Sequence, residues 1–160
     1  MHQFDLRNRT AIITGGAQGL GLGIAKRFIE SGAEVIIWDI DKRLIKEAKQ
    51  ELNSNKLTLQ IVDVTNFEDI KTNIDAIIIN KKVDIFVNNA GVTGLTTGLW
   101  DYPIDEWHKV LNVNLNGTFY CCKAIVPHMI KNNYGRIVNV ASVAGKDGNA
   151  NASAYSSAKA

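Results

Sequence analysis

The sequence predicts a doubly wound α/β fold, in which helices cover both faces of a mostly parallel β-sheet. Short β-branched segments alternate with helical segments, and the strand segments are almost continuously apolar instead of alternating with polar residues. Continuous apolar strands are typical of a parallel sheet that is buried on both faces. The regular alternation of strands and helices predicts that successive strands are joined by right-handed crossovers, as in a doubly wound sheet.

The first half of the chain contains three strand–helix units. Thr10–Thr14 (TAIIT) is expected to form the first strand, because it is a β-branched run that ends at a glycine-rich turn. The helix Leu20–Ser31 follows, with apolar residues at helical spacing. The second and third strands are expected at Val35–Trp38 and Leu57–Val62, and the helices behind them at Lys42–Leu52 and Phe67–Ile79.

The second half adds two strands separated by a long helical region. The fourth strand is expected at Asp84–Val87 and the fifth at Gly135–Val140. Between them lie a Gly/Thr-rich loop, Gly91–Gly98, and helical sequence from about Ile104 to Lys131. No repeat, low-complexity segment or linker interrupts the pattern, so residues 1–160 are expected to form one domain.

Composition argues against several functional classes. Hydrophobic residues make up 46% of the chain and charged residues 21%, as in ordinary globular proteins, and the net charge is only +2. Without a basic stripe, a nucleic-acid partner is not expected. Without a signal segment or a run of about 18 apolar residues, we expect no membrane association and a cytoplasmic location.

Cysteine and histidine usage gives no sign of a metal centre or of a secreted disulfide framework. Cys121 and Cys122 are adjacent in a helical segment, where an ordinary disulfide cannot readily form, and we expect them to pack in the interior. His2, His108 and His128 are scattered without ligand spacing, so no metal site is predicted.

The segment Thr14–Gly21 (TGGAQGLG) follows the first strand and opens the first helix. Glycines allow a tight turn and a close approach of the backbone to a ligand, and a helix N-terminus attracts a pyrophosphate. The strand–loop–helix context predicts a dinucleotide site. A tight turn that binds nothing is the alternative.

Asp39, at the end of the second strand, favours NAD over NADP. A carboxylate there can accept hydrogen bonds from the adenosine ribose and would repel a 2′-phosphate, and Gln18 offers no positive charge to such a phosphate. Lys42 and Arg43 lie just beyond and leave NADP as the alternative cofactor.

The glycine spacing Thr-Gly-x-x-x-Gly-x-Gly resembles that of the short-chain dehydrogenase/reductase family in its compact form. Four further motifs of that family occur in the expected order: Asp63-Val64, Asn88-Asn89-Ala90-Gly91, Asn114-Leu115-Asn116-Gly117, and Ser142 with Tyr155-x-x-x-Lys159. The resemblance covers essentially the whole chain. It implies a Rossmann-like fold, an NAD(P)-dependent oxidoreductase activity on an alcohol or ketone, and a set of site residues.

The resemblance implies roles residue by residue. The implied cofactor-binding residues are Gly15, Gln18, Gly19, Leu20, Gly21, Asp39, Asp63, Val64, Asn89, Ala90, Gly91, Tyr155 and Lys159. Tyr155 would be the general acid/base, and Ser142 would hydrogen-bond the same substrate oxygen. Lys159 would favour the tyrosinate and bind the nicotinamide ribose, and Asn114 would hold a water in a proton relay behind the lysine.

Simple electrostatics shows how far Lys159 could lower the pKa of Tyr155. Four residues along a helix place the two side chains about 6 Å apart on one face. A phenol with a pKa near 10 needs roughly 4 kcal/mol of stabilisation of its anion to act as a base at neutral pH. One ammonium at about 6 Å supplies roughly 3 kcal/mol at an effective dielectric constant near 20. The positive nicotinamide ring could provide the rest.

The sequence resembles both 3-oxoacyl-carrier-protein reductases and sugar-acid or polyol dehydrogenases. The segment Gly145–Ser153 (GKDGNANAS) favours the second group, because Asn149 and Asn151 could contact a hydroxylated substrate; both could also simply form the loop. The rival interpretation is a non-catalytic dinucleotide-binding module.

The rival interpretation arises at the C-terminus, where only Ala160 follows Lys159. Compact members of the family continue with the rest of this helix, two further strands and a substrate lid. The resemblance therefore predicts a fragment of a longer dehydrogenase, with strand order 3-2-1-4-5 and the fifth strand exposed at an edge. Relatives usually form homo-oligomers through helices equivalent to about Gly117–Lys131 and the one beginning at Ser153.

Overall fold

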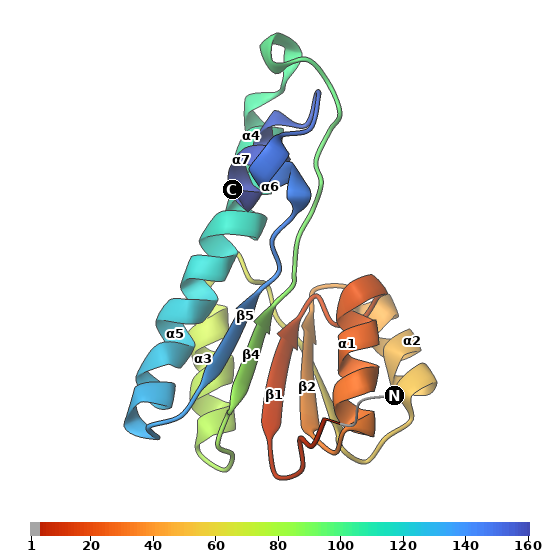
Figure 1. The fold of residues 1–160 in the computed structure, drawn as a ribbon, viewed down its shortest axis with the longest axis vertical. Coiled ribbons are helices and arrows are strands. Elements are labelled where there is room, and N and C mark those ends of the chain that lie inside the picture. The colour runs from red at the N-terminus through yellow and green to blue at the C-terminus, as the bar shows by residue number, and fades with distance from the viewer. Residues whose placement is uncertain (1–3) are drawn as a thin grey trace.

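The computed structural model describes residues 4–160 and contains a five-stranded parallel sheet in the order β3-β2-β1-β4-β5 (Figure 1). The central strand β1 (Thr10–Thr14) pairs with β2 (Glu34–Asp39) on one side and β4 (Ile85–Asn88) on the other. The outer strands are β3 (Leu57–Ile61) and β5 (Arg136–Asn139). This order confirms the predicted topology.

Helices cover both faces of the sheet, as the apolar strands required. The helices α1 (Gly19–Glu30) and α2 (Lys42–Leu52) pack on one face, and α3 (Phe67–Ile78) and α5 (Gly117–Lys131) pack on the other (Figure 1). Successive residues of β1 supply the two cores, since Ile12 faces the α3/α5 side and Ile13 the α1/α2 side. Every residue of β1 is buried.

The edge strand β5 differs from the central strands. All four of its residues are exposed, including Ile137 at 37% and Val138 at 48%. This exposure agrees with the expectation for a fifth strand at the edge of the sheet. Its backbone pairs only with β4 among residues 4–160.

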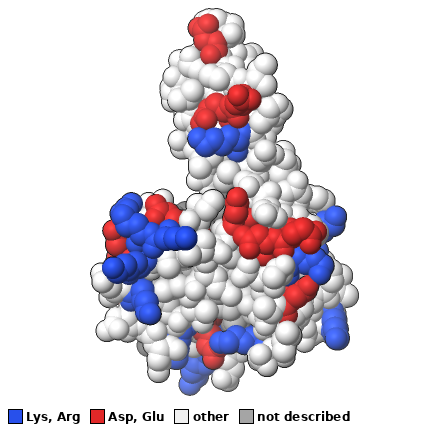
Figure 2. Space-filling view, turned by 180° about the vertical axis from the view of Figure 1, so that it is seen from behind, with Lys and Arg blue, Asp and Glu red and all other residues white. Residues whose placement is uncertain are grey.

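A second group of elements stands beyond the carboxyl ends of the strands, and we call it the upper lobe (Figure 1). It contains the 3-10 turn η1 (Leu99–Asp101), α4 (Ile104–Leu111), α6 (Val143–Asp147) and α7 (Ser153–Lys159). Three small buried residues, Val110, Ala154 and Ala158, form its core. On the face shown in Figure 2, charged side chains of both signs are interspersed and most of the upper lobe is uncharged.

Three short elements were not expected from the sequence, and the 3-10 turn η1 is the first of them. The helical region predicted across Ile104–Lys131 is interrupted by a π-helical turn, η2 (Asn112–Asn116), between α4 and α5. The short helix α6 forms where we expected a loop, because the Ser142 hydroxyl accepts a hydrogen bond from the Ala144 N–H and caps it. The other elements begin or end within one residue of their expected limits.

In the described part of the chain, no helix is long and apolar enough to cross a membrane. No three His, Cys, Asp or Glu side chains among residues 4–160 gather into a metal-binding group. Cys121 is buried in the core, where burial raises the pKa of its thiol to about 12. His128 accepts a hydrogen bond from the Val83 N–H, and His2 lies outside the described residues.

Candidate active site

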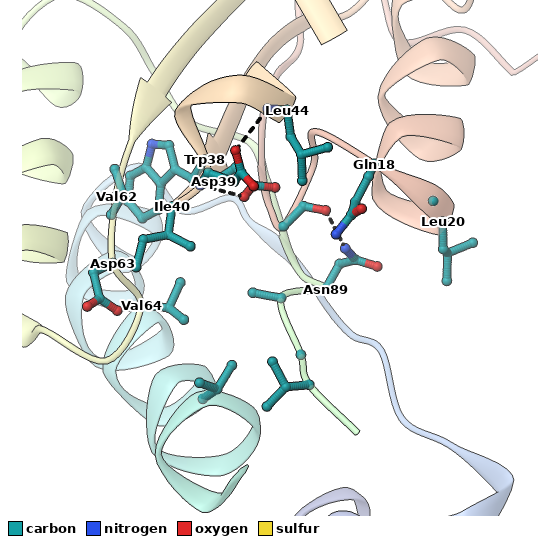
Figure 3. A pocket seen from close by; sticks show the side chains of 17 residues that line it. Gln18, Leu20, Trp38, Asp39, Ile40, Leu44, Val62, Asp63, Val64 and Asn89 are labelled. Atoms are coloured by element: carbon teal, nitrogen blue, oxygen red, sulfur yellow. Dashed lines mark hydrogen bonds between the residues drawn. The ribbon is translucent and has the colours of Figure 1, made fainter. Parts of the chain in front are cut away.

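A cavity of about 520 Å³ opens at the carboxyl ends of β1, β2, β3 and β4 (Figure 3). In a doubly wound sheet this edge, where the strand order reverses, is the usual place for a ligand. The cavity is lined by residues that the sequence singled out: Gly15, Gln18, Gly19, Leu20, Asp39, Asp63, Val64, Asn89, Ala90 and Gly91. Segments far apart in the chain therefore meet around one space.

The glycine loop is held close to the segment that follows β4. Gly15 has a φ of +58°, and a Cβ on it would lie 2.8 Å from the Cα of Ala90. Asn89 fixes the loop from the other side, because its amide nitrogen donates to the carbonyls of Thr14 and Gly15 at 3.0 and 2.9 Å. Gly21 does not line the cavity; a Cβ there would overlap the Gly15 carbonyl. These contacts leave room for glycine only.

The helix that starts at the cavity has no cap of its own. Asp41 caps α2 and Asn66 caps α3, each by accepting two backbone N–H groups. Gln18 makes no such bond at α1, and the first turn of α1 contains no acidic residue. The free N–H groups and the positive end of the helix dipole therefore remain available to an anionic group of a ligand.

Asp39 stands at the wall of the cavity with only 9% of its surface exposed. One carboxylate oxygen accepts from the Ala17 N–H at 3.2 Å, and the other accepts from the Asp41 N–H at 3.1 Å. These bonds hold the carboxylate at the end of β2, and each oxygen keeps a lone pair for a further donor. Arg43 is occupied nearby, since its guanidinium contacts Glu47 at 2.9 Å.

The Lys159 ammonium lies where several motifs converge. It donates to the Val140 carbonyl at 2.8 Å, and burial lowers the pKa of this half-buried lysine. A Cβ on Gly91 would lie 3.5 Å from the Lys159 nitrogen and 2.6 Å from the Asn114 side-chain oxygen. Lys159, Asn114 and Gly91 are therefore neighbours, although they come from α7, η2 and the segment that follows β4.

Asn114 is buried, and its side chain binds the backbone of Val92 on both sides. The amide nitrogen donates to the Val92 carbonyl at 2.8 Å, and the amide oxygen accepts from the Val92 N–H at 3.1 Å. The π-helical turn places the side chain in this position. Asn114 thus fixes the chain beside Gly91, and its expected contact with a relay water stays a prediction.

Tyr155 and Ser142 lie on the two helices of the upper lobe that pack together. Tyr155 packs against the lobe core of Val110, Ala154 and Ala158. The helices α6 and α7 meet so closely that a Cβ on Gly145 would overlap the Lys159 carbonyl. Within residues 4–160 no hydrogen bond joins the side chains of Ser142, Tyr155 and Lys159, and none of the three lines the cavity.

A profile of the short chain dehydrogenase family matches residues 9–160, nearly the whole chain. The chain belongs to the short-chain dehydrogenase family. The expected fold is also confirmed by solved structures: the chain superposes on an NAD+-bound xylitol dehydrogenase with a TM-score of 0.92 at 33% identity, covering 96% of this chain and 60% of that one.

Curated relatives within the short-chain dehydrogenase family include enzymes of different specificity. A 2-dehydro-3-deoxy-L-rhamnonate dehydrogenase (NAD(+)) of Sphingomonas sp. (strain SKA58) is 44% identical over 153 residues, which is 95% of this chain and 61% of that enzyme. A 3-oxoacyl-acyl-carrier-protein reductase of Chlamydia pneumoniae is 36% identical, with 97% of this chain and 63% of that protein covered. The chain therefore spans about three fifths of the length of these relatives.

The short-chain dehydrogenase motifs did not reveal the apolar part of the cavity wall. Six apolar residues complete the wall, namely Trp38, Ile40, Leu44, Val62, Val92 and Val113, and Asp41 is a seventh, polar one. Trp38, Ile40 and Val62 lie at one end of it together with Asp63 and Val64, whereas Leu44 lies between Asp39 and Gln18 (Figure 3). The position of Trp38 and Val62 at strand ends was a usable signal. Val113 had none, because the unexpected π-helical turn presents it.

Proposed function

We propose that this chain binds NAD in the cavity and contributes the catalytic residues of an oxidoreductase that acts on a secondary alcohol or its ketone. The observation that supports this most directly is the convergence of Gly91, Asn114 and Lys159 next to the cavity. The bound dinucleotide would supply hydride transfer at its nicotinamide ring. The protein residues would bind it, orient the substrate and move one proton.

Each end of the cavity suits a different part of a dinucleotide. The glycine loop and the uncapped start of α1 suit the pyrophosphate. Asp39 suits the adenosine ribose, and the apolar side chains around Trp38 and Ile40 suit a flat aromatic base. The cavity continues to Gly91 and Val92, on the side of Lys159.

NAD is the proposed cofactor, and NADP the less favoured one. The Asp39 carboxylate is buried and held by two backbone N–H groups, so it cannot easily turn away from a 2′-phosphate. Arg43 is already paired with Glu47. The NAD+-bound xylitol dehydrogenase and the rhamnonate-type dehydrogenase are NAD proteins by name, which agrees with this choice.

Tyr155 is the proposed general acid/base, which donates a proton to a carbonyl oxygen or removes one from an alcohol. Ser142 would stabilise the same oxygen, since its hydroxyl hydrogen is free while its oxygen caps α6. Lys159 would favour the tyrosinate. The Val140 carbonyl holds its ammonium in place.

The proposed substrate class is a hydroxylated acid or a polyol, with a 3-oxoacyl thioester as the second candidate. Asn149 and Asn151 lie exposed on the segment between Ser142 and Tyr155, where they could bind hydroxyl groups. The relatives in both classes are similar to this chain over nearly its whole length.

Calorimetric titration with NAD and NADP tests the cofactor. We expect NAD to bind at least about tenfold more tightly, because one unpaired charge contact is typically worth 1–3 kcal/mol. Asp39→Ser should weaken NAD binding and narrow the difference between the two cofactors. Tighter binding of NADP to the unsubstituted chain would contradict the choice of NAD.

Turnover of a panel of sugar acids, polyols and 3-hydroxyacyl thioesters tests the chemistry. Tyr155→Phe should lower the rate by about 10²–10⁴, because it removes the proton donor, and leave the NAD dissociation constant unchanged. Tyr134→Phe, which removes a phenol remote from the cavity, is the matched control. Equal rates for Tyr155→Phe and the unsubstituted chain would rule out Tyr155 as the acid/base.

A non-catalytic dinucleotide-binding module remains the second candidate. The observation in its favour is that Tyr155 and Lys159 lie on a helix of only seven residues, packed on a three-residue core. NAD binding without turnover of any panel member would support this candidate over the enzyme.

Self-association is also proposed. Leu115 and Phe119, in η2 and α5, are about half exposed, which is unusual for large apolar side chains this close together. Sedimentation equilibrium of the full-length protein should show a dimer or tetramer, and Phe119→Lys should shift it towards the monomer.

A further inference from the structure

Two segments at least partly exposed adjoin the proposed catalytic residues, and we call them the rim segments. The first, Gly91–Gly98, continues from β4 past Asn114. The second, Gly148–Ala152, joins α6, which Ser142 caps, to α7, which carries Tyr155. A substrate whose oxygen lies between Ser142 and Tyr155 therefore has both segments beside it.

The second rim segment cannot be held in place by burial. Its residues from Gly148 to Asn151 are exposed, and only Ala152 is buried. Two of its residues have a left-handed backbone, Gly148 with a φ of +78° and Asn151 with a φ of +61°. Asparagine tolerates this conformation better than other residues with a Cβ. The shape of the segment thus depends on the hydrogen bonds that it makes.

Five hydrogen bonds fix the second rim segment. One runs from the Ser156 N–H to the Ala152 carbonyl at 2.9 Å and joins the segment to α7, and only one of the other four uses a side chain. Its backbone bonds run from the Gly148 N–H to Ala144, from the Ala152 N–H to Asn149, and from the Thr97 N–H of the first rim segment to the Asn151 carbonyl at 2.9 Å. The fourth runs from the Asn149 N–H to the Ser156 hydroxyl at 3.1 Å. Ser156 is the residue directly after Tyr155.

We propose that Ser156 is a positioning residue of the substrate entrance, a role that rests on the proposed function of Ser142 and Tyr155. Its hydroxyl ties the second rim segment to the first turn of α7, where its own N–H bonds the Ala152 carbonyl at 2.9 Å. The Asn151 carbonyl then holds Thr97 of the first rim segment. One hydroxyl next to the general acid/base thereby sets the spacing of both segments.

Because of these bonds, we expect loss of the Ser156 hydroxyl to weaken substrate binding and to leave cofactor binding unchanged. Neither Ser156 nor any residue of Gly148–Ala152 lines the cavity. Gly91 and Val92, at the start of the first rim segment, do line it, but two hydrogen bonds from Asn114 hold Val92 independently of Ser156. The bond lies at the surface, where water competes for both partners, so its loss should loosen the segment without unfolding the lobe. The effect should reach Thr97 through Asn151.

Amide hydrogen exchange measured by NMR on the 160-residue chain tests the proposal. In Ser156→Ala, the amides of Asn149 and Thr97 should exchange about three- to fivefold faster, as expected for the loss of one exposed hydrogen bond. Ser156→Thr keeps the hydroxyl and should restore the slower exchange. Ser157→Ala is the matched control, because Ser157 is an exposed neighbouring serine whose side chain makes no hydrogen bond among residues 4–160.

The outcomes separate this proposal from the proposed function. Unchanged exchange at Asn149 in Ser156→Ala, or a change at Asn149 without one at Thr97, would overturn the positioning role. Calorimetric titration of the same variant with NAD should give an unchanged affinity. If the unsubstituted chain does not bind NAD, the proposed function fails while the exchange result stands.

Substrate kinetics gives the second readout. On an alcohol that the unsubstituted chain oxidises, Ser156→Ala should raise KM about threefold and leave kcat within about twofold, because the hydroxyl acts on the rim and not on the proton. Ser156→Thr should return KM to its original value. A fall in kcat at constant KM would contradict the assignment.

Discussion

The cavity at the ends of the strands and the upper lobe, which lie side by side (Figure 1), are built in different ways. The cavity stands on strands whose residues are buried from both faces, such as all five of β1. The lobe has a core of three small buried residues, and its second rim segment is held by hydrogen bonds at the surface. Burial of a large apolar core stabilises the first region. A smaller core, flanked by partly buried side chains such as Tyr102 and Trp107, and surface hydrogen bonds stabilise the second.

The difference shows that the cavity proposed to bind NAD and the upper lobe, which carries Tyr155 and Lys159, need not be equally stable. Regions with few buried apolar contacts open locally at a smaller free-energy cost than the global unfolding of the protein. We therefore expect the cavity to keep its form under conditions in which Tyr155 and Lys159 lose theirs. Three experiments can break or sharpen this comparison.

The largest effect, on NAD affinity, is expected from Gly15→Ala, which places a methyl group where the glycine loop lies closest to Ala90. The new Cβ would lie 2.8 Å from the Ala90 Cα, at a residue whose φ of +58° already disfavours a side chain. We expect NAD affinity to fall on the order of 100-fold, measured by calorimetry.

Two other glycines serve as controls for that experiment. Gly19 also has a positive φ, +53°, but nothing lies within 4 Å of a Cβ there, so Gly19→Ala should cost about tenfold in NAD affinity. Gly23→Ala, in open space within α1, should leave binding unchanged and stabilise the protein by up to about 1 kcal/mol. Equal losses for all three would show that the close approach to Ala90 is unimportant.

An intermediate effect, on the free energy of unfolding, is expected when a buried valine is shortened to alanine in the sheet and in the upper lobe. Val35 in β2 and Val110 in α4 are both fully buried. Val35→Ala should lower the free energy of unfolding in urea by about 2 kcal/mol, because it opens a cavity in the large core. Val110→Ala should lower it by about 1 kcal/mol or less and instead speed amide exchange in α4 and α7. Equal losses would mean that the lobe and the sheet unfold together.

The smallest effect concerns His128, at the end of the molecule away from the site. Its imidazole accepts from the buried Val83 N–H at 3.1 Å, which only a neutral ring can do. Burial lowers the pKa of His128, and Lys131 and Lys82 lower it further, while Asp84 opposes them. Because the folded pKa lies below the unfolded value, the contact contributes stability above about pH 6.5 and loses it as the pH falls.

Urea unfolding between about pH 7.5 and pH 5.5 measures this loss, with His128→Gln as the variant whose side chain does not titrate. The variant should show a shallower pH dependence, with a difference of at most one proton. Because the contact between His128 and Val83 lies beside the sheet and not in the upper lobe, amide exchange rates in α7 should not change with protonation of His128. A pH-dependent opening confined to the upper lobe would contradict this assignment.

The sequence predicted those parts of the molecule that depend on short-range patterns. The strands, the turn at Gly15 and the carboxylate of Asp39 could be located because each is specified within a few residues. The predicted catalytic residues were located by motif alone. The structure brings Asn114 and Lys159 together beside Gly91 and places Ser142 and Tyr155 on adjacent helices.

The remainder depends on contacts between segments distant in sequence. The π-helical turn at Asn112–Asn116 accompanies the two bonds between Asn114 and Val92, which are 22 residues apart. The Lys159 ammonium is held by a carbonyl 19 residues away, at Val140. None of these three hydrogen bonds produces a periodic pattern in the sequence. The same is true of Val113 in the cavity wall and of the Ser156 hydroxyl on Asn149.

The cavity wall also carries a natural optical reporter. Trp38 is fully buried, its indole N–H donates to Gln60 at 2.8 Å, and its ring meets Phe86 edge to face at 5.7 Å, while one side borders the cavity. Trp100 in the upper lobe is 85% exposed. The emission of the buried Trp38 should therefore report occupancy of the cavity. Trp107 in α4 is packed against the lobe core, so its emission should move to longer wavelength when the lobe opens, whereas the exposed Trp100 should give a constant background.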